Sequence, residues 1–207
     1  IPGAESVRFA RNGKDVTEAA VRLARFVTGR RHVVFCGYHG GFSDYLITTA
    51  HPGGILAHLC QFNHQVAWND IAALRELVEV YRNDVAAILL EVPPEPPERT
   101  PEDTAATLRC YVDTAHQAGA LAICDEVVTG LRYGLGGAQA LYGVTADLAT
   151  YSKALANGLP LAALAGPRDL LQHCASGDVF LSTTFGGETT ALAAARAVLV
   201  TLRDTDA

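Results

Sequence analysis

The segment Ala120-Leu121-Ala122-Ile123-Cys124-Asp125 is an apolar run that ends in one acid. A short apolar run bounded by turn residues is typical of a strand that is buried on both faces of a sheet. A helical pattern precedes it, from the capping pair Thr100-Pro101 to Gln117, and Gly119 ends that pattern. The segment therefore predicts a helix followed by a buried strand, with Asp125 at the carboxyl end of the strand.

The same alternation continues on both sides of this segment. Apolar residues recur at helical spacing, and short apolar runs lie between the helical stretches. The further predicted helices are residues 15–27, 69–81 (with Asn69 as its cap) and 188–202, and the further predicted strands are residues 32–36, 85–90, 148–151 and 161–164. Repeated alternation of strands and helices predicts an α/β domain with a largely parallel sheet.

Composition limits the class of protein. Of the 207 residues 49% are hydrophobic and 18% are charged, which predicts a buried core rather than disorder. The net charge of −6 argues against binding to a nucleic-acid backbone. The five cysteines lack C-x-x-C spacing, which favours a reducing, cytoplasmic location over a disulfide or zinc scaffold. No apolar stretch is long enough to span a membrane. The start at Ile1 and the lack of any Met indicate a fragment.

Polar residues follow directly after four of the predicted strands. Gly37-Tyr38-His39 follows the first strand, and Glu91 and Asp125 follow two others. Lys153 comes two residues after the strand 148–151. Because ligands of open α/β sheets bind at the carboxyl ends of the strands, these residues are expected to share one site. His39 either contacts that site or forms hydrogen bonds within its loop.

Asp125 and Lys153 each allow two interpretations when taken alone. A buried carboxylate needs a partner, so Asp125 either pairs with a cationic group such as a protonated ring nitrogen or caps the following turn. Lys153 is either a solvated surface lysine or a desolvated amine that can form an imine with an aldehyde. The histidines show no spacing typical of metal ligands, so no metal site is expected.

Three ordered motifs decide between these interpretations. They are Asp-Glu-Val-Val-Thr-Gly at 125–130, Ser-Lys-Ala-Leu-Ala-Asn-Gly-Leu-Pro at 152–160, and Ser-Thr-Thr-Phe-Gly-Gly-Glu-Thr at 182–189. Together they resemble the class III pyridoxal-phosphate-dependent aminotransferases, in particular the glutamate-1-semialdehyde 2,1-aminomutase branch. The resemblance covers nearly the whole chain. It implies the type I fold, a three-layer sandwich with a mostly parallel, mixed central sheet. Residues 1–207 would form its cofactor-binding large domain, without the N-terminal segment and C-terminal small domain.

The resemblance also implies roles around the cofactor ring, with pyridoxal 5′-phosphate as the cofactor. Lys153 would hold the cofactor as a Schiff base and would shuttle the proton of a 1,3-shift through a quinonoid-type intermediate. Asp125 would pair with the pyridinium nitrogen and keep it protonated, which makes the ring an electron sink. Val127 would pack under the ring, and Tyr38 would stack on its other face.

Further implied roles concern the phosphate and the ring substituents. Gly13 and Lys14 would hold the phosphate at the start of the first helix. Thr184 would donate its hydroxyl to the phosphate of the neighbouring subunit, which implies a homodimer with shared sites, and Glu91 would lie near the ring substituents.

The chain departs from the family in two places. Asn12-Gly13-Lys14-Asp15-Val16 stands where the family has Ser-Gly-Ser/Thr-Glu-Ala, and Glu91-Val92-Pro93-Pro94 reorders the usual Glu-Pro-Val.

Three functions follow from these expectations. The first is transfer or relocation of an amino group between small-molecule donors and acceptors. The second uses the same residues and cofactor for racemisation or epimerisation. The third is a truncated core without catalysis that acts as an assembly or regulatory subunit. The sequence does not identify the substrate.

Overall fold

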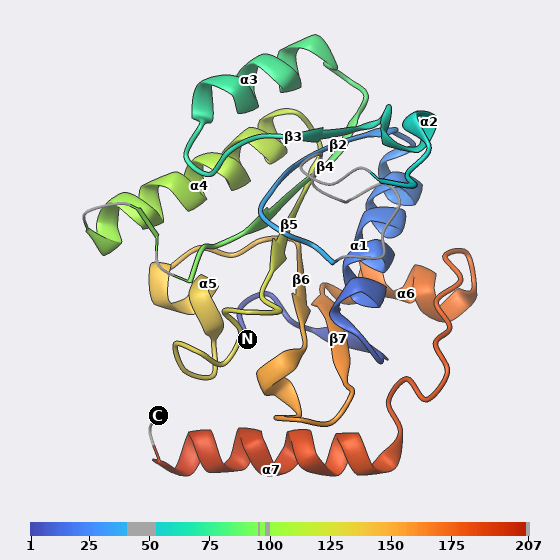
Figure 1. Cartoon of the computed structure of the whole chain (residues 1–207), viewed down its shortest axis with the longest axis vertical. Helices are drawn as coiled ribbons and strands as arrows, with labels where there is room; N and C mark the ends of the chain where they lie inside the picture. The colour runs from blue at the N-terminus through green and yellow to red at the C-terminus, as the bar shows by residue number, and fades with distance from the viewer. Residues whose placement is uncertain (41–52, 95, 98–99, 206–207) are drawn as a thin grey trace.

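The computed structural model describes residues 1–40, 53–94, 96–97 and 100–205, and these form a sheet with helices on both sides (Figure 1). Its strands are β1 (Ser6–Ala10), β2 (His32–Cys36), β3 (Asn63–Gln65), β4 (Val85–Glu91), β5 (Leu121–Asp125), β6 (Leu148–Tyr151) and β7 (Ala162–Gly166). The helices are α1 (Gly13–Thr28), α2 (Ala57–Cys60), α3 (Ile71–Val80), α4 (Pro101–Gln117), α5 (Gly137–Tyr142), α6 (Arg168–Ser176) and α7 (Thr189–Thr205), with a 3-10 turn η1 (Lys153–Leu155).

The described residues form one seven-stranded mixed sheet in the order β1-β7-β6-β5-β4-β2-β3. Five neighbouring strands of this order, β6, β5, β4, β2 and β3, pair in parallel. The strand β7 is antiparallel to both of its neighbours, β6 and β1. The predicted α/β class with a mostly parallel sheet is therefore confirmed.

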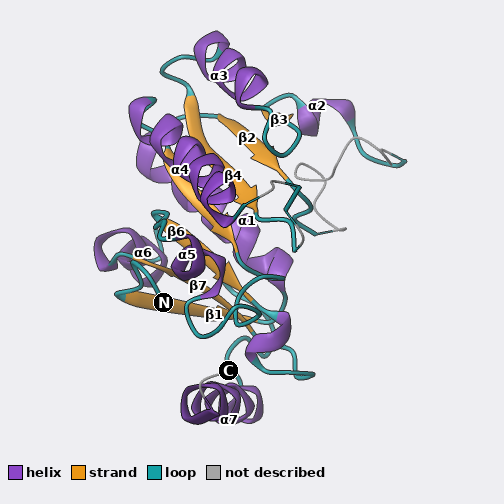
Figure 2. Ribbon diagram, turned by 90° about the vertical axis from the view of Figure 1, so that its left-hand side faces the viewer, coloured by secondary structure: helices purple, strands orange, loops and turns teal. Residues whose placement is uncertain are grey.

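Successive residues of the central strands face opposite layers of the molecule. In β4, Ala87 and Leu89 pack with α1 and α6, whereas Ile88 and Leu90 pack with α3, α4 and α5. Figure 2 shows helices on either side of the strands. Because both faces are covered, the central strands are continuous apolar runs, and the arrangement is the predicted three-layer sandwich.

Most predicted elements occur where expected, and the differences have local causes. The cap of α3 is Asp70, whose side chain accepts the Ala73 N–H at 3.0 Å, and Asn69 lies before it with a positive φ of 64°. The expected cap was therefore wrong by one residue. The structure adds β1, β3, α2, α5 and α6, which the apolar pattern did not predict. The sequence also predicts a loop from Gly37 to about Gly54, because it is rich in Gly, His and Pro, and residues 41–52 of it lie outside the described ranges.

The parallel register aligns the polar ends of the central strands. Glu91 pairs with Asp125 across β4 and β5, and Asp125 pairs with Thr150 across β5 and β6. The three residues therefore lie side by side at the carboxyl edge of the sheet.

Among the helices of the described ranges, none is long and apolar enough to cross a membrane.

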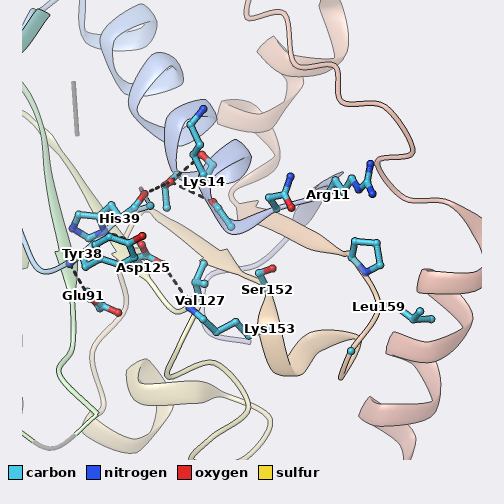
Figure 3. Close-up of a pocket in the computed structure, with 16 residues that line it drawn as sticks. Arg11, Lys14, Tyr38, His39, Glu91, Asp125, Val127, Ser152, Lys153 and Leu159 are labelled. Carbon is cyan, nitrogen blue, oxygen red and sulfur yellow. Dashed lines mark hydrogen bonds and ion pairs between the residues drawn. The ribbon is translucent and has the colours of Figure 1, made fainter. Parts of the chain in front are cut away.

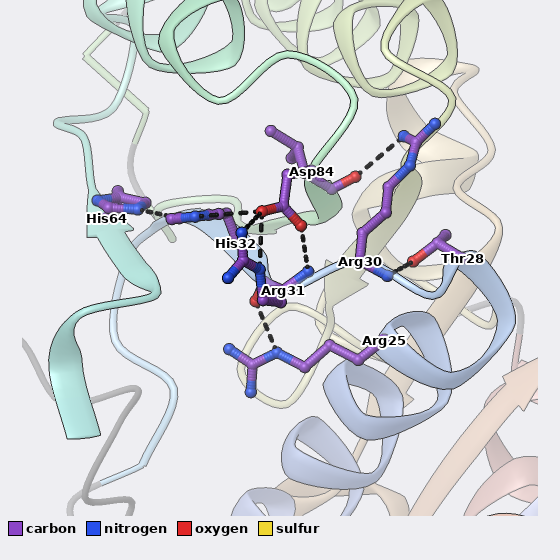
Figure 4. A network of polar contacts seen from close by, with 8 residues as sticks. Arg25, Thr28, Arg30, Arg31, His32, His64 and Asp84 are labelled. Atoms are coloured by element: carbon purple, nitrogen blue, oxygen red, sulfur yellow. Dashed lines mark hydrogen bonds and ion pairs between the residues drawn. The ribbon is translucent and has the colours of Figure 1, made fainter. Parts of the chain in front are cut away.

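A polar cluster lies at the opposite, amino-terminal edge of the sheet (Figure 4). His32 Nδ1 and His64 Nε2 lie 2.8 Å apart, so one ring donates and the other accepts. Tyr81 stacks on both imidazoles, at 3.9 and 4.3 Å between ring centroids. Arg31 pairs with Asp84, which lies 3.6 Å from His32 Nε2. The cluster joins β2 to the edge strand β3 and to the turn before β4.

Burial lowers the pKa of both histidines in this cluster. The Asp84 charge opposes the shift at His32, while the nearby Arg31 and Arg25 charges support it. The His32 charge adds to the shift at His64. Because the folded-state pKa values lie below the unfolded value of about 6.5, the unfolded chain binds more protons in acid. Stability is thus lost as the pH falls below about 6.5.

We expect the free energy of unfolding to decrease when the pH is lowered from about 7.5 to about 5.5. His64→Gln should reduce this decrease, because it removes one of the two titrating rings. Urea unfolding at both pH values measures the effect, with His58→Gln as the control. An unchanged pH dependence in His64→Gln would contradict the assignment.

Candidate active site

A cavity of about 410 Å³ opens at the carboxyl edge of the sheet, beside the start of α1 (Figure 3). Seven of the eight residues predicted for the site line it. They are Gly13, Lys14, Tyr38, Glu91, Asp125, Val127 and Lys153. Thr184 does not line the cavity and lies exposed in the loop before α7. Its predicted role concerns a second subunit and stays a prediction.

Asp125 is buried at the end of β5 and is held from three directions. Its Oδ1 accepts the Val127 N–H and the Thr150 hydroxyl, both at 3.0 Å. Its Oδ2 lies 2.7 Å from His39 Nδ1. A carboxylate offers about four acceptor positions, so one remains for a donor in the cavity. The Val127 hydrogen bond is the turn cap of one interpretation of Asp125. The acceptor position that remains keeps pairing with a cationic ring nitrogen as a prediction.

The contact with His39 explains how the Asp125 carboxylate can be buried. Its Nε2 lies 2.9 Å from the carbonyl oxygen of Cys36, which can only accept, so Nε2 carries a hydrogen. The short contact to Asp125 holds a second hydrogen, and the two side chains together are electrically neutral. A neutral, hydrogen-bonded pair avoids the cost of an isolated buried charge. Sequence reasoning left the role of His39 open, although its place after a strand end was a usable signal.

Glu91 lies at the end of the neighbouring strand. Its Oε2 accepts the Tyr38 N–H at 2.9 Å, which fixes the backbone where Tyr38 enters the cavity. Burial raises the pKa of Glu91 and the Asp125 charge adds to this, while the Tyr38 N–H, His39 and Lys153 oppose it. A side chain at Gly37 is excluded, because its Cβ would lie 2.6 Å from the Glu91 Cβ at a φ of 101°.

Lys153 starts the turn η1 directly after β6, with an unusual backbone. Its φ of 42° lies in the left-handed region, which costs a residue other than glycine of order 1–3 kcal/mol. Ser152 fixes this turn by donating its hydroxyl to the Leu161 carbonyl at 2.8 Å. The Lys153 side chain is exposed at the cavity. Strain of this kind is found where a side chain is held for function.

The first turn of α1 offers free donors to the cavity. Among the described residues there is no acceptor for the backbone N–H of Gly13 or of Lys14. Free N–H groups at a helix N-terminus bind anions such as phosphate. A Cβ at Gly13 would lie 2.9 Å from both Val127 methyl carbons, so only glycine allows Val127 to pack there. The Thr17 hydroxyl lies within 3.3 Å of three carbonyl oxygens and is engaged with them.

Lys14 lines the cavity with its stem, and its ammonium group points along the helix. The Nζ atom pairs with Glu18 at 3.1 Å. The neighbouring cation, Arg11, extends over the Phe185 ring at 5.9 Å from its centroid. Figure 3 shows both cationic groups turned away from Asp125. In this arrangement the phosphate turn offers backbone N–H groups, and both cations are engaged elsewhere.

Comparison with known proteins places this geometry in a family. The family model described as Aminotransferase class-III matches residues 1–207. A glutamate-1-semialdehyde 2,1-aminomutase of Methanoculleus marisnigri is 38% identical over 220 residues, which cover 98% of this chain and 51% of that protein. The protein of the same name in Nitratidesulfovibrio vulgaris strain DP4 is 34% identical over 226 residues, covering 100% of this chain and 51% of that protein.

A solved structure shares the fold. The FumI protein of Sphingopyxis sp. MTA144, in its PLP internal aldimine form, superposes with a TM-score of 0.84 and is 27% identical, covering 99% of this chain and 49% of that chain. The chain spans about half the length of the curated relatives it matches. These similarities confirm the resemblance seen in the three sequence motifs. Since one family model matches the chain from end to end, the chain belongs to the class-III aminotransferase family.

Proposed function

We propose that this chain carries the pyridoxal-phosphate site of an enzyme that transfers an amino group or moves it within a small molecule. One observation carries the proposal: a lysine, a buried acid and a free helix N-terminus converge on one cavity. The chain has only two lysines, Lys14 and Lys153, and both line that cavity. Pyridoxal 5′-phosphate is the cofactor that the family and its PLP-bound structural neighbours indicate.

The residues present fit this cofactor. Asp125 has an acceptor position left for a ring N–H, and the N–H groups of Gly13 and Lys14 suit a phosphate. Val127 and Tyr38 provide the two faces between which a ring would lie. The Glu91 carboxylate lies beside Asp125 and would contact the ring substituents. The missing hydroxyl at position 14 is compatible with binding, because backbone N–H groups alone can hold a phosphate.

Lys153 has two tasks in the proposed reaction. Its Nζ would hold the cofactor through the cofactor's aldehyde while no substrate is bound, and it would be a free amine once an amino substrate has taken its place. As a free amine, Nζ would accept the proton of the substrate Cα and hold it for its return to the substrate-derived product. Bound pyridoxal phosphate supplies the electron sink that makes this Cα proton acidic.

Asp125 and His39 control a proton that does not move during the reaction. Asp125 would accept the ring N–H of the cofactor and would keep that nitrogen protonated. His39 holds the Asp125 carboxylate in place through the 2.7 Å contact. Because both side chains are buried, water does not compete for these hydrogen bonds. The pair would therefore orient the ring relative to Lys153.

The substrate and the assembly belong to the same proposal. Glutamate-1-semialdehyde is the substrate to test, because the curated relatives are named for it. Small-molecule amino donors and acceptors, a homodimer in which Thr184 reaches the phosphate of the other subunit, and a cytoplasmic location complete the proposal. Residues 1–207 would be its cofactor-binding large domain. The family and the named aminomutases favour amino transfer over racemisation and over a core without catalysis.

Borohydride reduction of the full-length protein with pyridoxal phosphate should leave a stable adduct on Lys153. Peptide mass spectrometry locates the adduct. Lys153→Ala should abolish it, whereas Lys14→Met, which removes the other lysine of the cavity, should retain it. An adduct on Lys14, or no adduct at all, would contradict the proposal.

Asp125→Asn should lower turnover by about 100-fold or more, because one preorganised electrostatic partner of the charge that develops in a reaction contributes about 10²–10³-fold to turnover. The assay follows conversion of glutamate-1-semialdehyde to the isomer with its amino group moved from C2 to C1. Asp113→Asn, at an exposed site on α4, is the control and should behave like the unmodified protein. Equal turnover in the two variants would exclude a role for Asp125.

Thr184→Val should raise the dissociation constant of pyridoxal phosphate about tenfold, since hydrogen bonds to charged groups contribute about 1.5–3 kcal/mol. Equilibrium dialysis of the dimeric protein measures this constant. The control is Thr201→Val, on the exposed side of α7. Retention of the cofactor equal to that of the control would argue against a phosphate site shared between subunits.

A further inference from the structure

A second buried acid, Glu126, lies directly beside the cavity but does not line it. It follows Asp125 and precedes Val127, and its side chain is completely buried. Its Oε2 accepts the Thr129 hydroxyl at 2.5 Å and the Ala138 N–H at 3.0 Å. Its Oε1 accepts the Gln139 N–H at 2.9 Å. The carboxylate thus receives three donors, two of them from the first turn of α5.

Gln139 continues this network towards the neighbouring strand. Its Oε1 accepts the Ala146 N–H at 2.9 Å, in the segment before β6. Its Nε2 donates to the Tyr151 hydroxyl at 3.4 Å. Tyr151 is the last residue of β6 and lies two positions before Lys153. The path from Glu126 through Gln139 to Tyr151 therefore joins the end of β5 to the end of β6.

The backbone ties the same two strand ends together. The Glu126 N–H donates to the Thr150 carbonyl at 2.8 Å, and the Gly130 N–H donates to the Glu126 carbonyl at 2.7 Å. The charge of Glu126 also reaches Tyr151, whose pKa is raised first by burial and then by this carboxylate. Glu126 and Tyr151 are therefore close enough to be coupled electrostatically as well as through Gln139.

Two glycines make room for this network. A Cβ at Gly137, where φ is 64°, would lie 2.6 Å from Glu126 Oε2. A Cβ at Gly130 would lie 2.5 Å from the Glu126 carbonyl oxygen and 2.6 Å from the Tyr151 ring. Both contacts are shorter than any real Cβ allows, so the positions are open to glycine only. The cluster is therefore close-packed as well as hydrogen-bonded.

We propose that Glu126, Gln139 and Tyr151 are positioning residues that hold Asp125 and Lys153 in their relative geometry. The inference rests on the proposed function. Side chains alternate along a strand, so Asp125 faces the cavity while Glu126 faces α5 on the other side. A shift of Glu126 would move Asp125 and Val127 together, and a shift of Tyr151 would move the strained turn at Lys153. Rigid support of this kind is what precise placement of reacting groups requires.

Three variants of the full-length protein test this inference: Glu126→Gln, Gln139→Met and Tyr151→Phe. Each keeps the size of the side chain and removes hydrogen bonds of the network. Thr114→Val is the matched control, because Thr114 is a buried polar residue whose hydroxyl donates to the Cys110 carbonyl, within α4. Thermal unfolding without cofactor identifies the variants that fold, and the other measurements are made well below their midpoints.

Two readouts besides activity separate positioning from general stability. The first is the dissociation constant of pyridoxal phosphate, which should rise about fivefold or more in Glu126→Gln and Gln139→Met. The second is the visible circular dichroism per bound cofactor, which reports how the ring is held. It should fall to about half in these variants and less in Tyr151→Phe. The control should match the unmodified protein in both.

The outcomes distinguish this inference from the proposed function. If the unmodified protein does not bind pyridoxal phosphate, the proposed function is wrong. If it binds, and every folded variant keeps the affinity and dichroism of the Thr114→Val control, the positioning network is wrong. If Glu126→Gln does not fold, the other two variants test the positioning network. Tyr151→Phe is the mildest of them, because it removes a single hydroxyl.

Discussion

The site depends on one buried contact, the 2.7 Å approach of His39 Nδ1 to Asp125 Oδ2. A carboxylate at the end of a buried strand would otherwise be too costly to keep. His39 makes the pair neutral and is itself anchored to the Cys36 carbonyl, at the end of β2. The contact thereby joins the end of β2 to the end of β5, and the end of β4 with Glu91 lies between them. The histidine after β2 therefore acts together with the Val127 N–H and the Thr150 hydroxyl to stabilise an acid at this place.

Parallel pairing turns this local contact into a site. Because Glu91, Asp125 and Thr150 share one level of the sheet, whatever fixes Asp125 also fixes the start of the turn at Lys153. The positive φ of Lys153 is a local strain of the backbone. The Ser152 hydrogen bond and the packed end of β6 hold it. The geometry of the lysine is thus set by the sheet beneath it.

The sequence predicted the parts of this architecture that depend on apolar pattern. The strands His32–Cys36 and Leu148–Tyr151 were predicted to the residue, because both are buried on both faces. The strand β1 was missed, since Val7 and Phe9 point outwards and its inner side chains include Ser6 and Arg8. For the site, strand-end polar residues and family motifs predicted seven lining residues. His39 stayed open because a hydrogen-bond partner 86 positions away leaves no trace in local sequence.

The residues of the cavity are of two kinds, buried and exposed. Asp125, which would contact the ring nitrogen, is buried, and so are its hydrogen-bond partners His39 and Thr150. Those at the mouth, Tyr38 and Leu159, are 55% and 40% exposed. Rigid placement suits the cofactor chemistry, whereas exposed side chains can be covered by other parts of a longer protein. In the proposed function the buried residues would therefore hold the cofactor, and the substrate would be met at the exposed mouth.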